Sequence, residues 1–301
     1  MLARYLRGMI VLLLAVTALV SLGLGMWAPW LAAVPGLLLL SCPCSVLAVQ
    51  CVAAAYCNRR DPAPPASLPQ LFKAWLREIG AASKVFLWWQ PFRSNRFPDQ
   101  LPASTPAGRQ RGIVFVHGFL CNRGVWNAWY PRLQREGIPF EALNLEPPFA
   151  SIDAYACLLD AAVTRMRADT GMHPLVVCHS MGGLAARAWM RAKGPDAQVH
   201  RIVTIGSPHR GTRLGHWTPQ LPAIANAHQM RLDSEWLRAL VSVEAAELRR
   251  KFVCFYSNCD NIVFPATSAT LPDADNRHIP GVPHLALALD GRVVGQVLAL
   301  L

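Results

Sequence analysis

The segment that decides the fold is Leu175-Val176-Val177-Cys178-His179-Ser180-Met181-Gly182-Gly183-Leu184. It has the pattern of a buried strand that turns sharply into a helix, with the serine at the corner. In a nucleophile elbow of this design, the turn lifts the hydroxyl clear of the sheet and the helix N-terminus points its N–H groups at the same place. The usual pattern is G-x-S-x-G; Gly182 fills its second glycine position, and Cys178 stands in place of the first. The match is partial, so its meaning depends on the partners of Ser180.

Short apolar runs and helical patterns alternate from Gly112 to the C-terminus, as a parallel sheet covered by helices requires. We expect strands at residues 113–116, 140–145, 175–178, 202–205 and 252–256. We expect helices at residues 125–135, 152–168, 183–191 and 291–301. The predicted fold class for residues 112–301 is therefore α/β, with a mostly parallel sheet flanked by helices. Residues 207–250 interrupt the alternation, and we expect them to form a cap over the active site.

A serine hydroxyl needs a base that takes its proton, and the base needs a carboxylate that holds its tautomer. In hydrolases built on this kind of sheet, the chain order is serine, acid, histidine. Asp260 follows the strand expected at 252–256, and His284 lies in the loop before the last helix. Both would lie at the same edge of the sheet as Ser180. We therefore predict Ser180 as nucleophile, His284 as base and Asp260 as acid.

Other acids and histidines are weaker candidates. Asp273 is the second choice for the acid, and His278 is another late histidine. His179 is adjacent to Ser180 and cannot reach its hydroxyl from within an elbow. Three histidines are placed in the cap without the spacing of a metal site: His209, His216 and His228. The remaining acids are placed in the cap, in a long loop and at the start of the last helix: Asp233, Asp275 and Asp290.

The negative charge that develops on the substrate oxygen needs two N–H donors. One is expected from Met181, directly after the nucleophile. The other is expected from Phe119, in the loop after the strand at 113–116, where Gly118 permits a turn beneath the substrate. Phe119 and Met181 are therefore the predicted oxyanion-hole residues.

Four motifs together resemble the lipase and esterase branch of the α/β-hydrolase superfamily. They are Val-His-Gly-Phe at 116–119, Cys-His-Ser-Met-Gly-Gly-Leu at 178–184, Thr-Ile-Gly-Ser-Pro-His-Arg-Gly-Thr at 204–212, and the pair of Asp260 and His284. The third is the most specific, because bacterial triacylglycerol lipases carry a similar run. The resemblance covers residues 112–301 and implies hydrolysis of carboxylic esters, of lipids or other hydrophobic acyl compounds, through a serine acyl-enzyme. Two alternatives stay open: acyl transfer by the same residues, and a catalytically idle fold that serves as a membrane scaffold.

Two apolar runs, residues 9–27 and 30–56, open the chain. Each is long enough to cross the hydrocarbon core, which takes about 20 helical residues. Arginines flank the pair at both outer ends: Arg4, Arg7, Arg59 and Arg60. By the positive-inside rule, residues 1–60 are a transmembrane hairpin that holds the catalytic domain on the cytoplasmic face of a bacterial inner membrane. A cleaved signal peptide and a single membrane anchor are the alternatives, and a signal peptide leaves the second run unexplained.

Residues 61–111 connect the hairpin to the catalytic domain. They begin with a stiff proline-rich stretch at 61–66 and continue with interleaved aromatic and basic residues at 71–89. After a membrane hairpin, this pattern is typical of a helix that lies among lipid headgroups. An amphipathic helix packed on the globular domain has the same pattern. The sequence leaves both interpretations open.

The formal charge of +11 comes almost wholly from arginines that are scattered along the chain. A nucleic-acid partner is not expected, because it requires basic residues gathered with aromatic platforms on one element. The expected partners are a hydrophobic ester or lipid substrate and the bilayer, while the oligomeric state is left open. Cysteines within apolar runs indicate a reducing compartment. The spacing in Cys42-Pro43-Cys44 does not suit a metal, so neither a metal nor a cofactor is expected.

Overall fold

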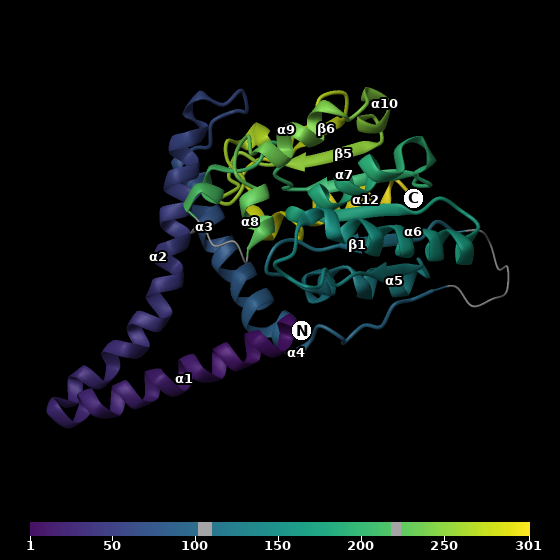
Figure 1. Cartoon of the computed structure of the whole chain (residues 1–301). Helices are drawn as coiled ribbons and strands as arrows, with labels where there is room; N and C mark the ends of the chain where they lie inside the picture. Colours follow the sequence, from purple (N-terminus) through teal and green to yellow (C-terminus); the bar gives the residue numbers. More distant parts are fainter. Residues whose placement is uncertain (102–109, 218–223) are drawn as a thin grey trace.

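The computed structural model describes residues 1–101, 110–217 and 224–301. Parts of the linker expected at 61–111 and of the cap expected at 207–250 lie outside these residues. Within the described chain, six strands form one parallel sheet in the order β2-β1-β3-β4-β5-β6 (Figure 1). They are β1 (Ile113–Val116), β2 (Phe140–Ala142), β3 (Leu175–His179), β4 (Arg201–Ile205), β5 (Phe252–Tyr256) and β6 (Asp275–His278). The predicted α/β class is confirmed.

Alternate residues of each strand pack on opposite faces of the sheet. In β1, Val114 and Val116 belong to one hydrophobic core, and Ile113 and Phe115 belong to the other. All four are fully buried. Strands covered on both faces read as continuous apolar runs, which is why the sequence pattern identifies the central strands.

Helices cover both faces of this sheet (Figure 1). The first face carries α6 (Ala156–Thr170), which follows the 3-10 turn η5 (Ile152–Tyr155), and α7 (Met181–Lys193), which ends at η6 (Gly194–Asp196). The second face carries η4 (Arg123–Ala128), α5 (Tyr130–Glu136) and α12 (Gly291–Leu298). A short α11 (His284–Leu287) precedes α12, and η8 (Ala266–Ala269) lies between β5 and β6.

Strand β6 is missed by the sequence pattern, which places Asp275 in a long loop. Its residues read Asp-Asn-Arg-His and pair in parallel with β5, from Val253 with Asp275 to Tyr256 with His278. The strand lies at the edge of the sheet, and its side chains are exposed or half-buried. The loop expectation is wrong because a polar edge strand carries no apolar run, and charged residues are common at such edges.

Between β4 and β5, the chain leaves the sheet and forms η7 (Arg213–Trp217), α8 (Ala225–Gln229), α9 (Glu235–Ser242) and α10 (Ala246–Arg249). A buried ion pair ties this insertion to α7. The Arg187 guanidinium donates hydrogen bonds to both Glu244 carboxylate oxygens at 2.9 and 2.8 Å, and to the His209 carbonyl at 2.7 Å. His209 is therefore a buried structural residue of the domain core.

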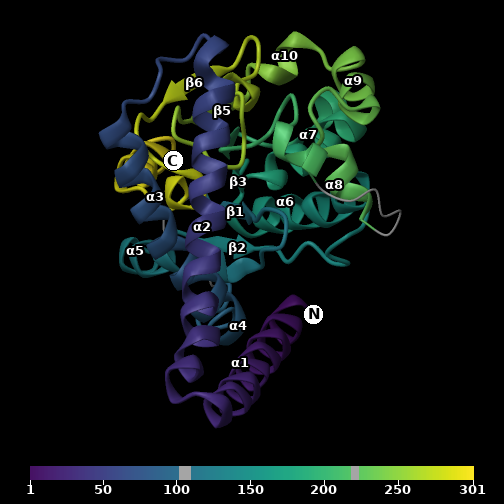
Figure 2. The ribbon, with the colours of Figure 1, turned by 90° about the vertical axis from the view of Figure 1, so that its left-hand side faces the viewer.

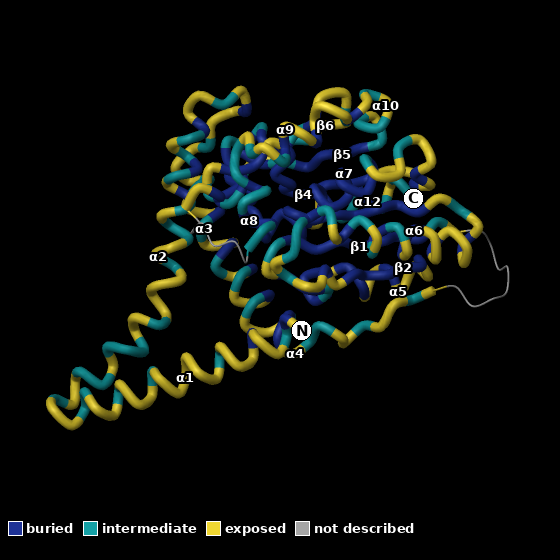
Figure 3. Tube along the Cα trace, in the orientation of Figure 1, coloured by how far each residue is buried: buried dark blue, intermediate teal, exposed yellow. Residues whose placement is uncertain are grey.

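The two apolar runs form α1 (Leu2–Trp27) and α2 (Val34–Cys57), joined by η1 (Pro29–Ala33) and followed by η2 (Asn58–Arg60). Their connecting turn is the part of the chain farthest from the sheet (Figure 1). Both segments are long and apolar enough to cross a membrane. Their apolar side chains are largely exposed along most of their length (Figure 3): Leu22 is 70% exposed and Leu40 is 72% exposed.

The domain ends of both helices contact the rest of the chain. Leu2 and Leu6 are buried at the start of α1. Along its second half, α2 passes in front of the sheet (Figure 2). Asn58 is buried at its end, where its side chain donates to the Asn258 carbonyl at 3.2 Å and accepts from the Ala266 amide at 2.9 Å. The domain-side end of α2 is therefore docked on the α/β domain by specific polar contacts.

Residues 68–92 form a continuous helical segment made of α3 (Leu68–Ala82), the π-helical turn η3 (Ser83–Trp89) and α4 (Gln90–Phe92). A capping box of Ser67 and Gln70 begins α3. One side of the segment is buried on the domain, and Ala81 and Val85 belong to the second core. The other side leaves large apolar residues exposed: Phe72, Leu76, Leu87 and Trp88. The segment thus packs on the domain and keeps an apolar outer surface.

Candidate active site

Ser180 lies at the corner between β3 and α7. Its backbone has φ 54° and ψ −126°, a region that residues with a side chain rarely adopt. Such strain persists only where the surroundings impose it, and here the strand and helix on either side are buried. Ser180 itself is 7% exposed and lines a cavity. The predicted elbow geometry is therefore present in the structure.

Small residues allow the elbow to pack tightly against its neighbours. A Cβ atom on Gly182 would lie 2.5 Å from the Val116 carbonyl oxygen, and one on Gly118 would lie 2.8 Å from the Ser180 Cβ. Neither site has room for a side chain. Cys178, which departs from the usual pattern, is fully buried in β3. Its place between β1 and β4 accommodates a thiol, so the elbow forms without the first glycine.

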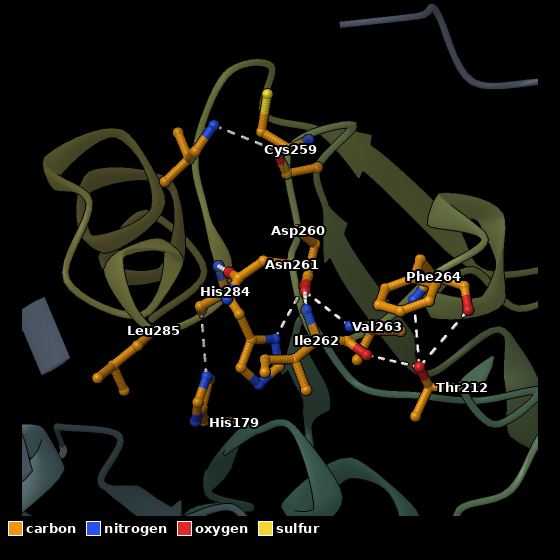
Figure 4. A network of polar contacts seen from close by, with 12 residues as sticks. His179, Thr212, Cys259, Asp260, Asn261, Ile262, Val263, Phe264, His284 and Leu285 are labelled. Carbon is orange, nitrogen blue, oxygen red and sulfur yellow. Dashed lines mark hydrogen bonds and ion pairs between the residues drawn. The ribbon is translucent and has the colours of Figure 1, made fainter. Parts of the chain in front are cut away.

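Asp260 and His284 are brought together at the carboxyl edge of the sheet (Figure 4). His284 Nδ1–H donates to Asp260 Oδ2 at 2.9 Å. The other carboxylate oxygen, Oδ1, accepts from the amides of Ile262 and Val263 at 2.9 and 2.7 Å. Both side chains are buried, Asp260 to 2% exposure and His284 to 6%. The carboxylate thus fixes the tautomer and ring orientation of His284, which leaves Nε2 as the basic nitrogen.

The pKa of His284 is raised above its ordinary value of 6.5. Burial is the largest influence and acts to lower it, because a buried imidazolium loses its hydration. The charge and hydrogen bond of Asp260, together with the charge of Glu78, act in the opposite direction and outweigh burial. The site therefore stabilises the protonated imidazole, the form that a general base takes during a reaction.

His179 and His117 serve as neutral supports. His179 is buried, and its Nε2–H donates to the His284 carbonyl at 3.3 Å (Figure 4). Burial lowers the pKa of His179 far below its ordinary value, and that of His117 to about 4. His117 Nδ1–H donates to the Gly118 carbonyl at 2.9 Å, while its Nε2 accepts from the Leu145 amide at 2.9 Å. These contacts fix the loop that carries Phe119.

The two predicted oxyanion donors belong to residues next to Ser180 in the chain or in the cavity lining. Met181 is the first residue of α7, so its N–H has no acceptor within the helix. Phe119 follows Gly118, which packs directly against Ser180. Phe119 lines the same cavity as Ser180 and His284. The following residue, Leu120, has φ 54°, which marks a tight turn at this place.

The cavity has a volume of about 740 Å³ and contains Ser180 and His284 in its lining. The segment between β4 and β5 contributes Leu214 and Met230. Most of the remaining wall comes from outside the hydrolase domain. The wall residues from α2, α3 and η3 are Leu39, Leu40, Cys42, Pro43, Cys44, Val46, Leu47, Gln50, Glu78, Ile79, Ala82, Ser83, Phe86 and Leu87.

The weaker candidates have other structural roles. Asp273 pairs with Arg249 at 2.6 Å, and Asp290 caps α12. His278 packs against the ring of Tyr256. The other two acids form ion pairs at the surface: Asp233 with Arg210, and Asp275 with Arg277. Within the described residues, no group of three or more histidine, cysteine or acidic side chains is arranged to hold a metal.

Sequence reasoning missed four residues around Asp260 and His284. Gly206 has φ 58°, and a Cβ there would lie 3.0 Å from Asp260 Oδ2. Asn261 and Glu78 accept hydrogen bonds from backbone amides at residues 284–286, and Gln50 accepts one from the Asn261 side chain. The sequence contains a signal for one of them, because Gln50 is a large polar residue within the long apolar run of α2.

Comparison with known proteins agrees with this architecture. A family model described as "Alpha/beta hydrolase family" matches residues 113–294. Among solved structures, the mature form of a Bacillus licheniformis lipase is 19% identical, with a TM-score of 0.54 over 66% of this chain and 94% of that chain. Aspergillus fumigatus lipase B is 19% identical, with a TM-score of 0.49 over 62% of this chain and 49% of that chain. No curated protein matches the chain significantly. Because the family match spans more than half of the sequence, the chain belongs to the α/β-hydrolase family, as its motifs predict.

Proposed function

We propose that the protein is a membrane-anchored serine hydrolase that cleaves carboxylic esters of acyl lipids at the bilayer. One observation carries the proposal: Ser180 and His284 line a cavity whose outer wall is an apolar helix long enough to cross a membrane. Substrate with a long acyl chain fits such a wall better than a polar ester does, because burial of apolar surface drives its binding. The lipase names of the solved structures agree with this chemistry.

The position of the wall along α2 suggests the route of the substrate. At about 1.5 Å per helical residue, Leu39 lies about 8 Å and Gln50 about 24 Å beyond Val34, where α2 begins. A hydrocarbon core is about 30 Å thick. If the hairpin turn lies at the far interface, the wall extends from about 8 to about 24 Å into the core, across its middle and into both leaflets. A lipid would then reach Ser180 sideways from the leaflet next to the domain.

Membrane insertion of α1 and α2 is supported by their surface. The helices expose large apolar residues, and Trp27 and Trp30 at the turn are 89% and 73% exposed, as in an interfacial aromatic belt. The arginines that flank the two helices favour a domain on the cytoplasmic side.

The proposed reaction is supported by the cavity that Ser180 and His284 share and by the hydrogen bond between His284 and Asp260. His284 Nε2 takes the Ser180 proton as Oγ attacks the ester carbonyl, and Asp260 stabilises the imidazolium. The amides of Phe119 and Met181 hold the oxyanion. His284 then gives the proton to the leaving alcohol, which departs and leaves an acyl-enzyme. A water molecule deprotonated by His284 releases the fatty acid, and an alcohol in place of water would give acyl transfer.

The test uses the full-length protein in phosphatidylcholine vesicles that contain diacylglycerol, with release of fatty acid as the measurement. Wild type should release fatty acid, and Ser180→Ala should not, while Ser242→Ala at an exposed position of α9 should match wild type. A folded wild type without activity on any ester would favour the idle scaffold. Acyl products that form only with added alcohol would favour a transferase.

A pair of tryptophan variants in α2 tests the lipid route. Leu47 lines the cavity, whereas Val49 is 59% exposed and lies outside its lining. Leu47→Trp should slow hydrolysis of long-chain esters and spare short-chain esters, and Val49→Trp should change neither. Equal behaviour of the two variants on long-chain esters would contradict a substrate site walled by α2.

A further inference from the structure

We propose that Glu78 of α3 and Gln50 of α2, which both precede the hydrolase domain in the chain, are positioning residues for His284. The inference rests on the proposed function, in which His284 is the general base. It goes beyond that function because it makes the hairpin and α3 part of the catalytic apparatus, whereas an anchor would only hold the domain at the membrane.

Glu78 binds the backbone directly after His284. It lies on α3, is 3% exposed, and its carboxylate accepts from the Leu285 amide at 2.9 and 3.2 Å and from the Ala286 amide at 3.1 Å. These amides belong to the first turn of α11, a helix of four residues, where N–H groups have no acceptor within the helix. Without Glu78, two N–H groups in a buried region would lose their hydrogen-bond partner, which is unfavourable.

Gln50 acts on the backbone of His284 through Asn261. The Asn261 side-chain carbonyl accepts from the His284 amide at 3.2 Å, and its NH₂ group donates to Gln50 Oε1 at 3.0 Å. Asn261 is fully buried and follows Asp260 in the chain. Gln50 thus fixes the orientation of the Asn261 side-chain amide. That amide binds the backbone of His284, and Asn261 directly follows Asp260.

The histidine segment is therefore held from several sides at once. Asn261 binds the His284 N–H, His179 binds its carbonyl, and Glu78 binds the next two amides (Figure 4 shows the first two contacts). Asn261 and His179 belong to the hydrolase domain. Glu78 belongs to α3, so the clamp is complete only when α3 is docked.

A carboxylate is not needed merely to dock α3 on the domain, because burial of a charged group lowers stability. Ala74, Ala81 and Val85 already bury the same side of α3 and its continuation without any polar group. The pKa of Glu78 is raised above its ordinary value, because burial outweighs the hydrogen bonds from Leu285 and Ala286 and the charge of His284, which lower it. The charge of Glu78 in turn favours protonated His284. A role toward the base accounts for a carboxylate at this position.

Other titratable groups share this region. Asp260 and His179 interact electrostatically with His284. Cys51 of α2 interacts with Glu78, Cys259 and Asp260, and Glu78 also interacts with Asp260. A variant that removes only the Glu78 charge leaves all of them in place. Its effect on the acid limb of the pH profile therefore reports the coupling between Glu78 and His284.

The experiment uses full-length protein and p-nitrophenyl butyrate, a short soluble ester. Glu78→Gln keeps the shape of the side chain but loses the charge and one acceptor oxygen, and Gln50→Leu removes the bond to Asn261. Arg77→Gln is the matched control, because Arg77 docks the same helix through Asp290 at 3.1 Å and does not touch residues 284–286. The readouts are kcat, KM, the acid limb of kcat/KM against pH, and the unfolding temperature.

We expect Glu78→Gln to lower kcat by roughly tenfold to a hundredfold, since displacement of a reacting group by about 1 Å can cost a hundredfold. Its KM should stay within about twofold, and its acid limb should move to lower pH because the imidazolium loses a stabilising charge. Gln50→Leu, which removes no charge, should lower kcat without the pH shift, and Arg77→Gln should change neither kcat nor the pH profile.

Three results would overturn the inference: unchanged kcat in both Glu78→Gln and Gln50→Leu, an equal loss of kcat in Arg77→Gln, or a rise in KM at constant kcat. Gln50→Leu keeps the test decisive if Glu78→Gln fails to fold. An inactive but folded wild type would instead contradict the proposed function, which separates the two failures.

Discussion

Replacement of Gly206 by alanine is a sharp test of the acid–base geometry. Gly206 directly follows β4, has φ 58°, and a Cβ there would lie 3.0 Å from Asp260 Oδ2 and 3.2 Å from His284 Nδ1. The substitution has two separable consequences. A non-glycine residue in a left-handed conformation loses about 1–2 kcal/mol of stability, and the added methyl group presses on the hydrogen bond between Asp260 and His284.

Gly171→Ala supplies the matched control. Gly171 ends α6 with φ 68°, and among the described residues nothing lies within 4 Å of a Cβ built there. The backbone penalty is therefore similar, about 1–2 kcal/mol, and no catalytic group is touched. Each variant should lower the unfolding temperature by a few degrees, at about 2–4 °C per kcal/mol for a domain of this size.

The activities of the two variants should differ. Relief of the contacts at Gly206 requires a shift of a few tenths of an ångström in Asp260 or His284. Because a misplacement of about 1 Å can cost a hundredfold, kcat of Gly206→Ala should fall by roughly threefold to tenfold. The assay is steady-state hydrolysis of p-nitrophenyl butyrate, with thermal unfolding measured on the same samples. Equal kcat for Gly206→Ala and Gly171→Ala would refute the assignment of this acid–base pair.

Three further predictions concern the rate, the elbow and the insertion. The acid limb of kcat/KM should have its midpoint above 6.5, because activity needs neutral His284 and its pKa is raised; Asp260→Asn should move that midpoint down and lower kcat by up to about 10⁴-fold. Cys178→Gly should keep kcat within about twofold while thermal unfolding reports a loss of about 2 kcal/mol, from backbone freedom and a small void in β3; an inactive folded variant would give the thiol a catalytic role. Glu244→Ala should destabilise the protein by about 3–5 kcal/mol in the same measurement, because it leaves the Arg187 guanidinium buried without its partner; a loss below about 1 kcal/mol would contradict that.

The sequence predicts the parts of the fold that depend on local pattern. Buried strands such as β1 and β3 are continuous apolar runs, and the strained turn at Ser180 carries a recognisable motif. The order of Ser180, Asp260 and His284 follows from the topology of the family, since each residue comes at the carboxyl end of a strand or in the loop before the last helix. The structure brings Asp260 and His284 into direct contact, as that order predicts.

The sequence does not predict contacts between segments that are far apart in the chain. Glu78 and Leu285 are separated by 207 positions, and Gln50 and Asn261 by 211. Nothing local to either member reveals its partner. The aromatic and basic pattern at 71–89 fits a membrane-surface helix as well as a helix docked on the domain. The docked position results from the packing of Ala81 and Val85 into the second core, which the local pattern does not reveal.

The most direct test of the central claim is reaction of the full-length protein with a fluorophosphonate, followed by identification of the modified peptide by mass spectrometry. A fluorophosphonate traps a serine whose hydroxyl is activated by a base and whose oxyanion is held by N–H donors. We predict one adduct on Ser180 in wild type, none at that position in Ser180→Ala, and much slower labelling in His284→Ala. A wild type that is folded by thermal unfolding and remains unlabelled, or an adduct on a different serine, would contradict the account.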